Sequence, residues 1–185
     1  MKDSILLFSN FIRNPREVGA LLPSSKFLAR EIARNINFKR SKRIVELGPG
    51  SGTFTKLIVR KAASDAWVVC IETNKRFCSY LAKNIPDARL KIINSGAQNI
   101  RRNLKKLNIR AADCIISGLP FSNFSLVKKK RILHEVHCAL AKNGRFVLFQ
   151  YTNGLNKLLK KYFTEINKTF IPWNMPPSFV YVCEK

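Results

Sequence analysis

Acidic residues are scarce in this sequence. It holds 11 Asp and Glu against 34 Lys and Arg, which leaves a formal net charge of +23 over 185 residues. That excess is far larger than solubility requires, so we expect a polyanionic partner, either nucleic acid or an anionic membrane surface. The length is sufficient for one domain with a well-buried core and is too short for two such domains.

Cysteine pairs and long apolar runs are missing as well. The five cysteines include no C-x-x-C pair, and an odd number cannot fully pair within one chain, so we expect reduced core thiols in a cytoplasmic protein. The N-terminal apolar stretch is interrupted by Asp3, Ser9, Asn10 and Arg13, which excludes a signal peptide or a spanning helix. Any membrane contact would be peripheral, at the inner membrane surface.

Two nucleotide-binding signatures fail in the glycine-rich stretch at 43–52, Arg-Ile-Val-Glu-Leu-Gly-Pro-Gly-Ser-Gly. The dinucleotide fingerprint needs a glycine where Thr53 stands, and no Gly-Lys-Ser/Thr follows to complete a P-loop. What remains is an acid, Glu46, before alternate glycines, which is typical of a buried strand entering a tight turn and a helix. The acid suits a cationic ligand, and S-adenosylmethionine fits because it has an ammonium, a sulfonium and no phosphate. A turn that uses glycine for steric reasons alone is the alternative.

Strand-like and helix-like segments alternate along the rest of the chain. We expect strands at 43–47, 67–72, 89–94, 113–117 and 145–151, and helices at 53–63, 74–84, 97–107 and 124–142. Gly144 stands where a helix C-cap is expected. A helix near 154–165 and an antiparallel pair at 167–172 and 179–183 complete the tail. The pattern predicts one α/β domain over 41–185, a doubly wound sheet of about seven strands with an antiparallel last strand.

In a doubly wound sheet the ligand lies at the carboxyl ends of the strands. Glu72 ends the second strand at the offset where an acid reaches a ribose diol, and an adenine could lie against the backbone after the third strand. The expected cofactor-binding residues all follow such ends: Glu46, Gly48, Pro49, Gly50, Ser51, Gly52, Glu72, Thr73, Gly96, Ala97, Gln98 and Ser117.

The first 40 residues form a basic, amphipathic segment. Residues 3–13 place apolar side chains at helical spacing before Asn14-Pro15, and a second helix is expected from the cap at Pro23 to about Ile36. Residues 1–43 hold ten Lys and Arg against three acids. The segment could pack on the core and cover the site, or it could insert into an anionic lipid interface.

Several motifs together resemble the bacterial phospholipid N-methyltransferases. They are Glu-Leu-Gly-Pro-Gly-Ser-Gly at 46–52, Ser-Gly-Leu-Pro-Phe at 117–121, Gln-Tyr at 150–151 and Trp-Asn-Met-Pro-Pro-Ser-Phe at 173–179. Members of that family are class I S-adenosylmethionine enzymes related to the rRNA adenine dimethyltransferases. The resemblance implies methylation of phosphatidylethanolamine and its methylated intermediates at the membrane surface, and we expect a monomer. Its expected catalytic residues are Ser117, Gly118, Leu119, Pro120, Phe121 and Tyr151, with Phe121 and Tyr151 beside the amine.

One departure from the family lies after the third strand, where the family tends to place an Asp before the residue that matches Ala97. Gly96 occupies that position, so adenine recognition would depend on the Ala97 backbone or on Gln98.

Two other functions fit parts of the sequence. An rRNA adenine methyltransferase suits the charge, but that family places an Asn where Gly118 stands and adds a helical RNA-binding domain for which we expect no room. The second alternative is a nonenzymatic protein that has the same fold and binds RNA or membranes. The basic runs at 101–110 and 128–131 are expected to be solvated helix faces without an aromatic platform. His134 and His137 are three apart with no further ligand cluster, so we expect no metal.

Overall fold

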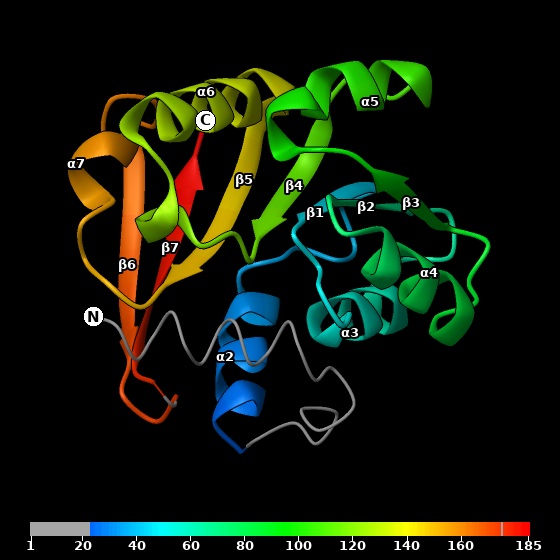
Figure 1. Cartoon of the computed structure of the whole chain (residues 1–185), viewed down its shortest axis with the longest axis horizontal. Coiled ribbons are helices and arrows are strands. Elements are labelled where there is room, and N and C mark those ends of the chain that lie inside the picture. Colours follow the sequence, from blue (N-terminus) through cyan, green and yellow to red (C-terminus); the bar gives the residue numbers. More distant parts are fainter. Residues whose placement is uncertain (1–22, 175) are drawn as a thin grey trace.

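The structure, a computed structural model, describes residues 23–174 and 176–185 and contains one seven-stranded sheet (Figure 1). Its order is β3-β2-β1-β4-β5-β7-β6, with β1 to β5 parallel and β7 antiparallel to both neighbours. The strands are β1 (Arg43–Leu47), β2 (Trp67–Glu72), β3 (Leu90–Asn94), β4 (Ala112–Ser117), β5 (Leu140–Gln150), β6 (Glu165–Ile171) and β7 (Ser178–Glu184). The expected doubly wound sheet with an antiparallel last strand is confirmed.

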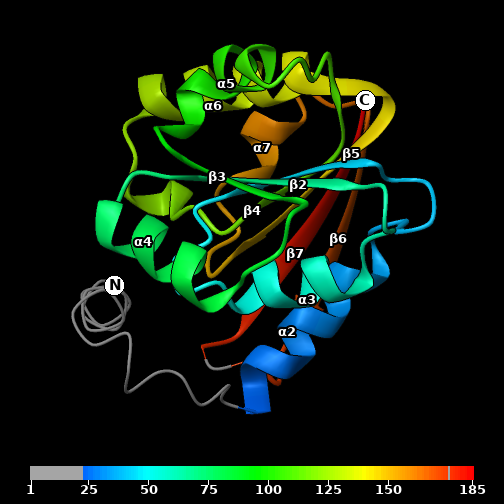
Figure 2. The same ribbon diagram turned by 90° about the vertical axis from the view of Figure 1, so that its right-hand side faces the viewer.

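Helices cover both faces of the sheet, as the edge-on view in Figure 2 shows. One face carries α2 (Pro23–Arg34), α3 (Thr53–Lys61) and α4 (Lys75–Asn84), and the other carries α5 (Ile100–Lys106), α6 (Leu126–Ala139) and α7 (Asn156–Leu159). Short 3₁₀ turns, η1 (Ala97–Asn99) and η2 (Phe121–Asn123), follow β3 and β4. With both faces covered, the central strands are buried on each side, which is why they read as continuous apolar runs.

Successive side chains of β1 enter two separate cores. Val45 and Leu47 pack on the face of α5 and α6, whereas Ile44 packs on the face of α2 and α3. Glu46 lies on the second face, because strand side chains alternate. This alternation decides which functional group at the strand end can reach the surface.

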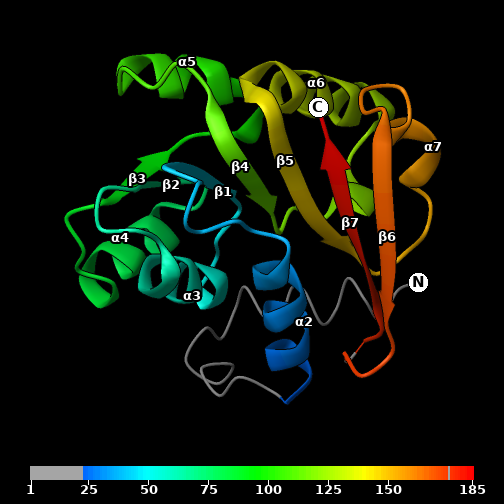
Figure 3. The same cartoon turned by 180° about the vertical axis from the view of Figure 1, so that it is seen from behind.

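The two ends of the parallel strands define two edges of the molecule (Figures 1 and 3). The carboxyl edge carries the turns that follow β1 to β5, together with the β6–β7 connection. The amino edge carries the segments that lead into β1, β2 and β4, where α2, α3 and α5 end.

Two expectations for the second half of the chain were wrong. Gly144 is not a helix C-cap: α6 ends at Ala139, Asn143 takes the left-handed conformation, and Gly144 lies inside β5. A Cβ on Gly144 would lie 2.9 Å from the Ala141 carbonyl oxygen, so close backbone approach requires the glycine. The expected helix at 154–165 is only the short α7, and β6 begins at Glu165.

All five cysteines are free, and Cys70, Cys114 and Cys183 are buried, as expected for core thiols. The amphipathic segment at 3–13 lies outside the described residues. None of the helices in the described ranges is long and apolar enough to cross a membrane.

Candidate active site

The turn from Gly48 to Gly52 connects β1 to α3 and forms the centre of the carboxyl edge. Gly48 and Gly52 have φ of +70° and +81°, in the left-handed region that favours glycine. A Cβ on Gly48 would lie 2.9 Å from Leu119 Cδ2, and one on Gly52 would lie 2.5 Å from Leu81 Cδ2. The turn is therefore held tightly against the β4 loop on one side and against α4 on the other.

Glu72, at the end of β2, binds the glycine turn directly. Its Oε2 accepts a hydrogen bond from the Gly50 amide at 3.2 Å, and its Oε1 accepts one from the Asn74 amide at 2.9 Å. Only 8% of the residue is exposed. The carboxylate thus lies beside the turn with lone pairs remaining, in the position where an acid can accept hydrogen bonds from ligand hydroxyls.

Glu46 lies beneath the turn rather than at its surface. The residue is 1% exposed, and its Oε2 accepts a hydrogen bond from Thr55 Oγ1 at 2.6 Å and lies 3.6 Å from Cys70 Sγ. Burial raises the pKa of this carboxyl to about 7. Its contacts anchor β1 to α3, so the described structure places Glu72, and not Glu46, at the mouth of the site.

The third-strand loop brings Gly96, Ala97 and Gln98 to the same edge. The Ser95 amide donates to the Glu72 carbonyl at 3.0 Å, and the Asn94 side chain donates to the Glu72 and Thr73 carbonyls. A Cβ on Gly96 would collide with the Gln98 amide group. The Gln98 amide therefore lies in the space that a side chain at position 96 would enter, which supports Gln98 as the polar group of this loop.

The fourth-strand loop contacts the glycine turn. The Gly118 amide donates to the Leu47 carbonyl at 3.0 Å, and a Cβ on Gly118 would lie 3.1 Å from the Gly48 carbonyl oxygen. Ser117 is buried, and its Oγ accepts a hydrogen bond from the Leu119 amide at 3.2 Å. Backbone atoms line this part of the site, and a side chain at position 118 would crowd the turn.

Phe121 is not brought to the surface of the site. It is fully buried in the core beneath the loop, with its ring 5.9 Å from the ring of Phe124. Tyr151 does reach the surface, with 43% of the residue exposed, and its ring lies 5.9 Å from that of Phe149. Burial of its phenol raises the pKa of Tyr151, so the hydroxyl is neutral at pH 7.

Sequence reasoning did not assign a role to Gln150, which fixes the fourth-strand loop. Its Nε2 donates to the Leu119 carbonyl at 2.9 Å, and the residue is 5% exposed. The signal was a lone amide at the end of an otherwise apolar strand, in the position next to Tyr151. In the β6–β7 connection, Asn174 donates to the Pro176 carbonyl at 2.7 Å and thereby shapes that loop.

Metal ligands do not gather in the described part of the chain, where no group of three or more His, Cys, Asp or Glu could hold an ion. His134 lies 3.7 Å from Cys138, and His137 packs edge-on against Phe163.

Strand order, glycine turn and Glu72 together define a class I S-adenosylmethionine-dependent methyltransferase fold. The N-methyltransferase NodS from Bradyrhizobium japonicum WM9, solved with S-adenosyl-L-homocysteine, superposes with a TM-score of 0.77 at 10% identity, over 93% of this chain and 92% of that one. A TehB-like S-adenosylmethionine-dependent methyltransferase from Corynebacterium glutamicum gives 0.71 at 16% identity, over 96% and 97%.

Within this class, the chain belongs to the ribosomal RNA adenine dimethylase family, whose model matches residues 21–139. It is 28% identical to an ornithine lipid N-methyltransferase from Singulisphaera acidiphila over 185 residues, 99% of this chain and 96% of that one. It is 25% identical to the ribosomal RNA small subunit methyltransferase A of Mesomycoplasma hyopneumoniae over 146 residues, 79% of this chain. That match spans only 51% of the ribosomal RNA enzyme. The expected relation to the rRNA dimethyltransferases is thus confirmed.

Proposed function

We propose that this protein transfers a methyl group from S-adenosylmethionine to the primary amine of a lipid headgroup, such as phosphatidylethanolamine or an ornithine lipid. The observation that carries the proposal is Gly118. In the related rRNA enzymes an Asn side chain is expected to hold the adenine amino group at this position. Here Gly118 offers no side chain, and a Cβ at this position would lie 3.1 Å from the Gly48 carbonyl oxygen, closer than an ordinary contact.

The relatives support the same proposal. Similarity to the ornithine lipid enzyme extends over 96% of its length, whereas similarity to the ribosomal RNA enzyme covers about half of that protein. An ornithine lipid and phosphatidylethanolamine both present a primary amine on a flexible headgroup. For either lipid, the site would have to position a primary amine beside the methyl group.

The chain's own residues fit the cofactor. When bound, S-adenosylmethionine would supply an electrophilic methyl group to the amine nitrogen and would leave as S-adenosyl-L-homocysteine. Glu72 would accept hydrogen bonds from the ribose hydroxyls, the glycine turn would admit the ligand close to backbone, and Gln98 would hold the adenine. Catalysis then depends on positioning and exclusion of water, because a held amine needs little further activation once it has lost its proton.

Aromatic side chains form the substrate wall. Tyr151 presents a neutral phenol and a ring face, which suits an amine that becomes cationic as methyl groups are added. Phe54, Phe149 and Tyr151 form a continuous row of rings, with centroids 5.7 and 5.9 Å apart. We therefore propose that Tyr151, and not the buried Phe121, is the aromatic side chain that contacts the substrate amine.

Membrane association remains part of the proposal. Phe170 and Trp173 lie at the carboxyl edge with 51% and 75% of each residue exposed. Exposed aromatic residues of this kind favour a membrane interface. The segment at 3–13 lies outside the described residues, and the location that we propose is the inner surface of the membrane.

Adenine N-methylation of rRNA is the second candidate, favoured by the family match and by the net charge of +23. A purified-protein assay separates the two. Tritiated S-adenosylmethionine is offered with vesicles of phosphatidylethanolamine, vesicles of an ornithine lipid, or deproteinised rRNA. We expect label in the lipid fraction with one or both vesicles. Label only in RNA would replace the proposal by the second candidate, and cofactor binding without any label would contradict both.

A further inference from the structure

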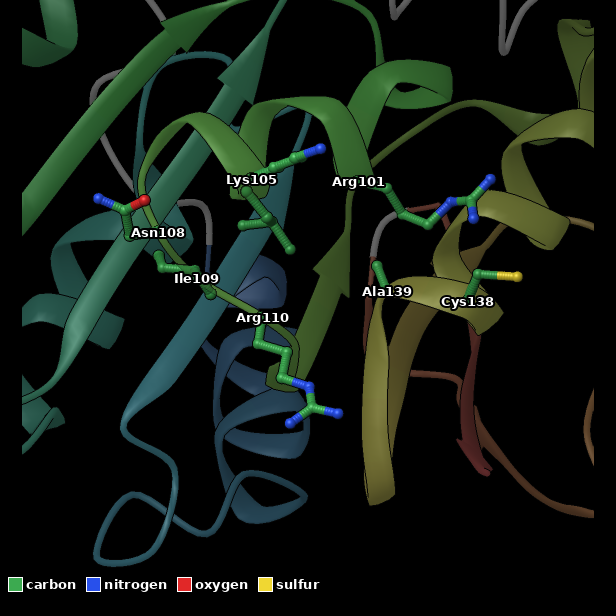
Figure 4. Close-up of a pocket in the computed structure, with 8 residues that line it drawn as sticks. Arg101, Lys105, Asn108, Ile109, Arg110, Cys138 and Ala139 are labelled. Atoms are coloured by element: carbon green, nitrogen blue, oxygen red, sulfur yellow. The ribbon is translucent and has the colours of Figure 1, made fainter.

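Two hollows adjoin each other at the amino edge, on the side of the molecule opposite the candidate active site. One, of about 410 Å³, lies between α5 and the end of α6, and Figure 4 shows the side chains around it. The other, of about 540 Å³, lies between the starts of β1 and β2. Asn108, Ile109 and Arg110 line both hollows, so the two form one continuous groove, which we name the amino-edge groove.

Cations dominate the walls of the amino-edge groove. Its lining contains five of them, Lys42, Arg43, Arg101, Lys105 and Arg110, and one acid, Asp65. Three of the cations already have acidic partners: Lys42 with Asp65, Arg43 with Asp113, and Arg101 with Glu135.

Lys105 and Arg110 are different, because neither forms a salt bridge within the described ranges 23–174 and 176–185. Both are exposed, and both line the hollow in Figure 4. Arg110 also lines the second hollow. The first hollow therefore holds two cations that no acid of the described ranges pairs with, and one of them, Arg110, lies where the two hollows meet.

An aromatic side chain flanks one of these two cations, Arg110. Trp67, the first residue of β2, lines the second hollow together with Arg110 and is 42% exposed. Lys91 Nζ lies 5.4 Å from the centre of its ring. The floor is apolar, formed in part by Leu104, Ile109 and Ala139. We expected no aromatic platform around the basic run at 101–110; the fold places one aromatic side chain, that of Trp67, in the same hollow as Arg110 at the end of that run.

We propose that the amino-edge groove binds single-stranded RNA, with phosphates at Lys105 and Arg110 and a base stacked on Trp67. Proteins that bind single strands combine a cationic groove with aromatic rings that stack on bases. The chemistry favours a strand over a bilayer, because a narrow linear polyanion can enter a groove, whereas a flat lipid surface touches only its rim. This inference is independent of the proposed lipid methylation, which takes place at the other edge.

Charge reversal tests the phosphate contacts. The full-length protein is titrated against a fluorescein-labelled ten-nucleotide oligouridylate, and binding is followed by anisotropy. The variant Lys105→Glu/Arg110→Glu should bind at least roughly tenfold more weakly at moderate salt, and the magnitude of its salt slope should fall by about 1.4 because two phosphate contacts are lost. The matched control is Lys157→Glu/Lys160→Glu, which makes the same change in net charge on or beside α7, away from the groove (Figure 1). Equal weakening by both variants would overturn the proposal, because it would mean that only total charge matters.

Tryptophan fluorescence tests the groove without charge reversal. The chain has two tryptophans, and Trp67 and Trp173 lie at opposite edges. In Trp173→Phe the remaining emission reports the amino-edge groove, and saturating oligouridylate should quench it substantially. In Trp67→Phe the same RNA should leave the emission of Trp173 unchanged. Quenching of Trp173 but not of Trp67 would overturn the proposal, as would a larger response of Trp67 to anionic phosphatidylglycerol vesicles than to RNA.

Discussion

The two edges of the sheet differ in the atoms that they present. At the carboxyl edge the glycine turn and the Gly118 loop expose backbone, and the ionisable group that meets them is Glu72. At the amino edge long cationic side chains dominate. The helices explain part of this difference, since α2, α3 and α5 carry basic residues in their last turns and no acid in their first. Cations are favourable at helix C-termini, and these termini gather at the amino edge.

Net charge therefore does not locate the active site. The site that fits S-adenosylmethionine lies where an acid meets close-packed backbone, whereas the amino-edge groove, with its five cations, lies at the opposite edge. Substitutions at the carboxyl edge should therefore change stability and cofactor affinity, whereas substitutions at the amino edge should leave both almost unchanged.

The largest effect is expected from Gly52→Ala. A Cβ there would lie 2.5 Å from Leu81 Cδ2 in a left-handed backbone, so overpacking and strain together should cost about 4 kcal/mol of unfolding free energy. Urea unfolding gives the value. Gly154→Ala is the control, because nothing lies within 4 Å of its Cβ position. Similar stability of the two variants would show that the turn is not tightly packed.

Glu46 should make stability depend on pH. Its folded pKa of about 7 lies above the ordinary value of 4.5, so its contribution is fully present below pH 4.5 and is lost as the pH rises through 7. The loss amounts to about 3 kcal/mol at most. Glu46→Gln should lose less unfolding free energy than the native chain between pH 5 and pH 8. Parallel pH profiles for the two proteins would mean that Glu46 is ionised in the fold without cost.

Glu72→Ala should weaken the cofactor. Loss of hydrogen bonds to a charged acceptor costs about 2 kcal/mol, or roughly 30-fold in affinity for S-adenosyl-L-homocysteine by calorimetry. Glu165→Ala, on exposed β6, is the control for loss of one acid. Unchanged affinity of the Glu72 variant would remove this residue from the site.

The smallest effect is expected at the amino edge, from Asp65→Asn. The pair with Lys42 is exposed, with 65% of the Asp65 side chain accessible, and exposed pairs contribute little to stability. Thermal unfolding should be unchanged within error, while affinity for oligouridylate rises because Lys42 is released. A clear loss of stability would mean that the groove's charges maintain the fold instead of binding a ligand.

Much of the fold followed from the sequence because buried parallel strands and their glycine turn are continuous along the chain. The strands at 43–47 and 67–72 have the expected bounds, as does the start of α3 at Thr53. Expectations failed where contacts between segments distant in sequence determine the local structure. Gly144 is fixed by its close approach to the Ala112 and Ala141 backbones. Of the helix expected near 154–165, only Asn156–Leu159 is helical, and Leu158, Leu159 and Phe163 are buried in the core.

The candidate site was predicted less completely for the same reason. Spacing placed Glu46 and Glu72 at strand ends, but only the pleat of β1 directs Glu46 beneath the turn. Spacing also marked the Ser-Gly-Leu-Pro-Phe loop, but its Phe121 packs inward while Tyr151, from the next strand, is exposed. Trp67 and Arg110 are 43 positions apart in sequence and line one hollow, which no local pattern reveals.

The central claim is that the carboxyl edge methylates a lipid amine. Its most direct test is mass spectrometry of lipids from a host whose amine-bearing membrane lipid is phosphatidylethanolamine, with and without expression of this protein. A parallel culture also makes an ornithine lipid. The account predicts N-methylated lipid in at least one culture, absent from a Glu72→Ala strain. Unmethylated lipid in both cultures, with new methyladenine in the rRNA, would contradict it.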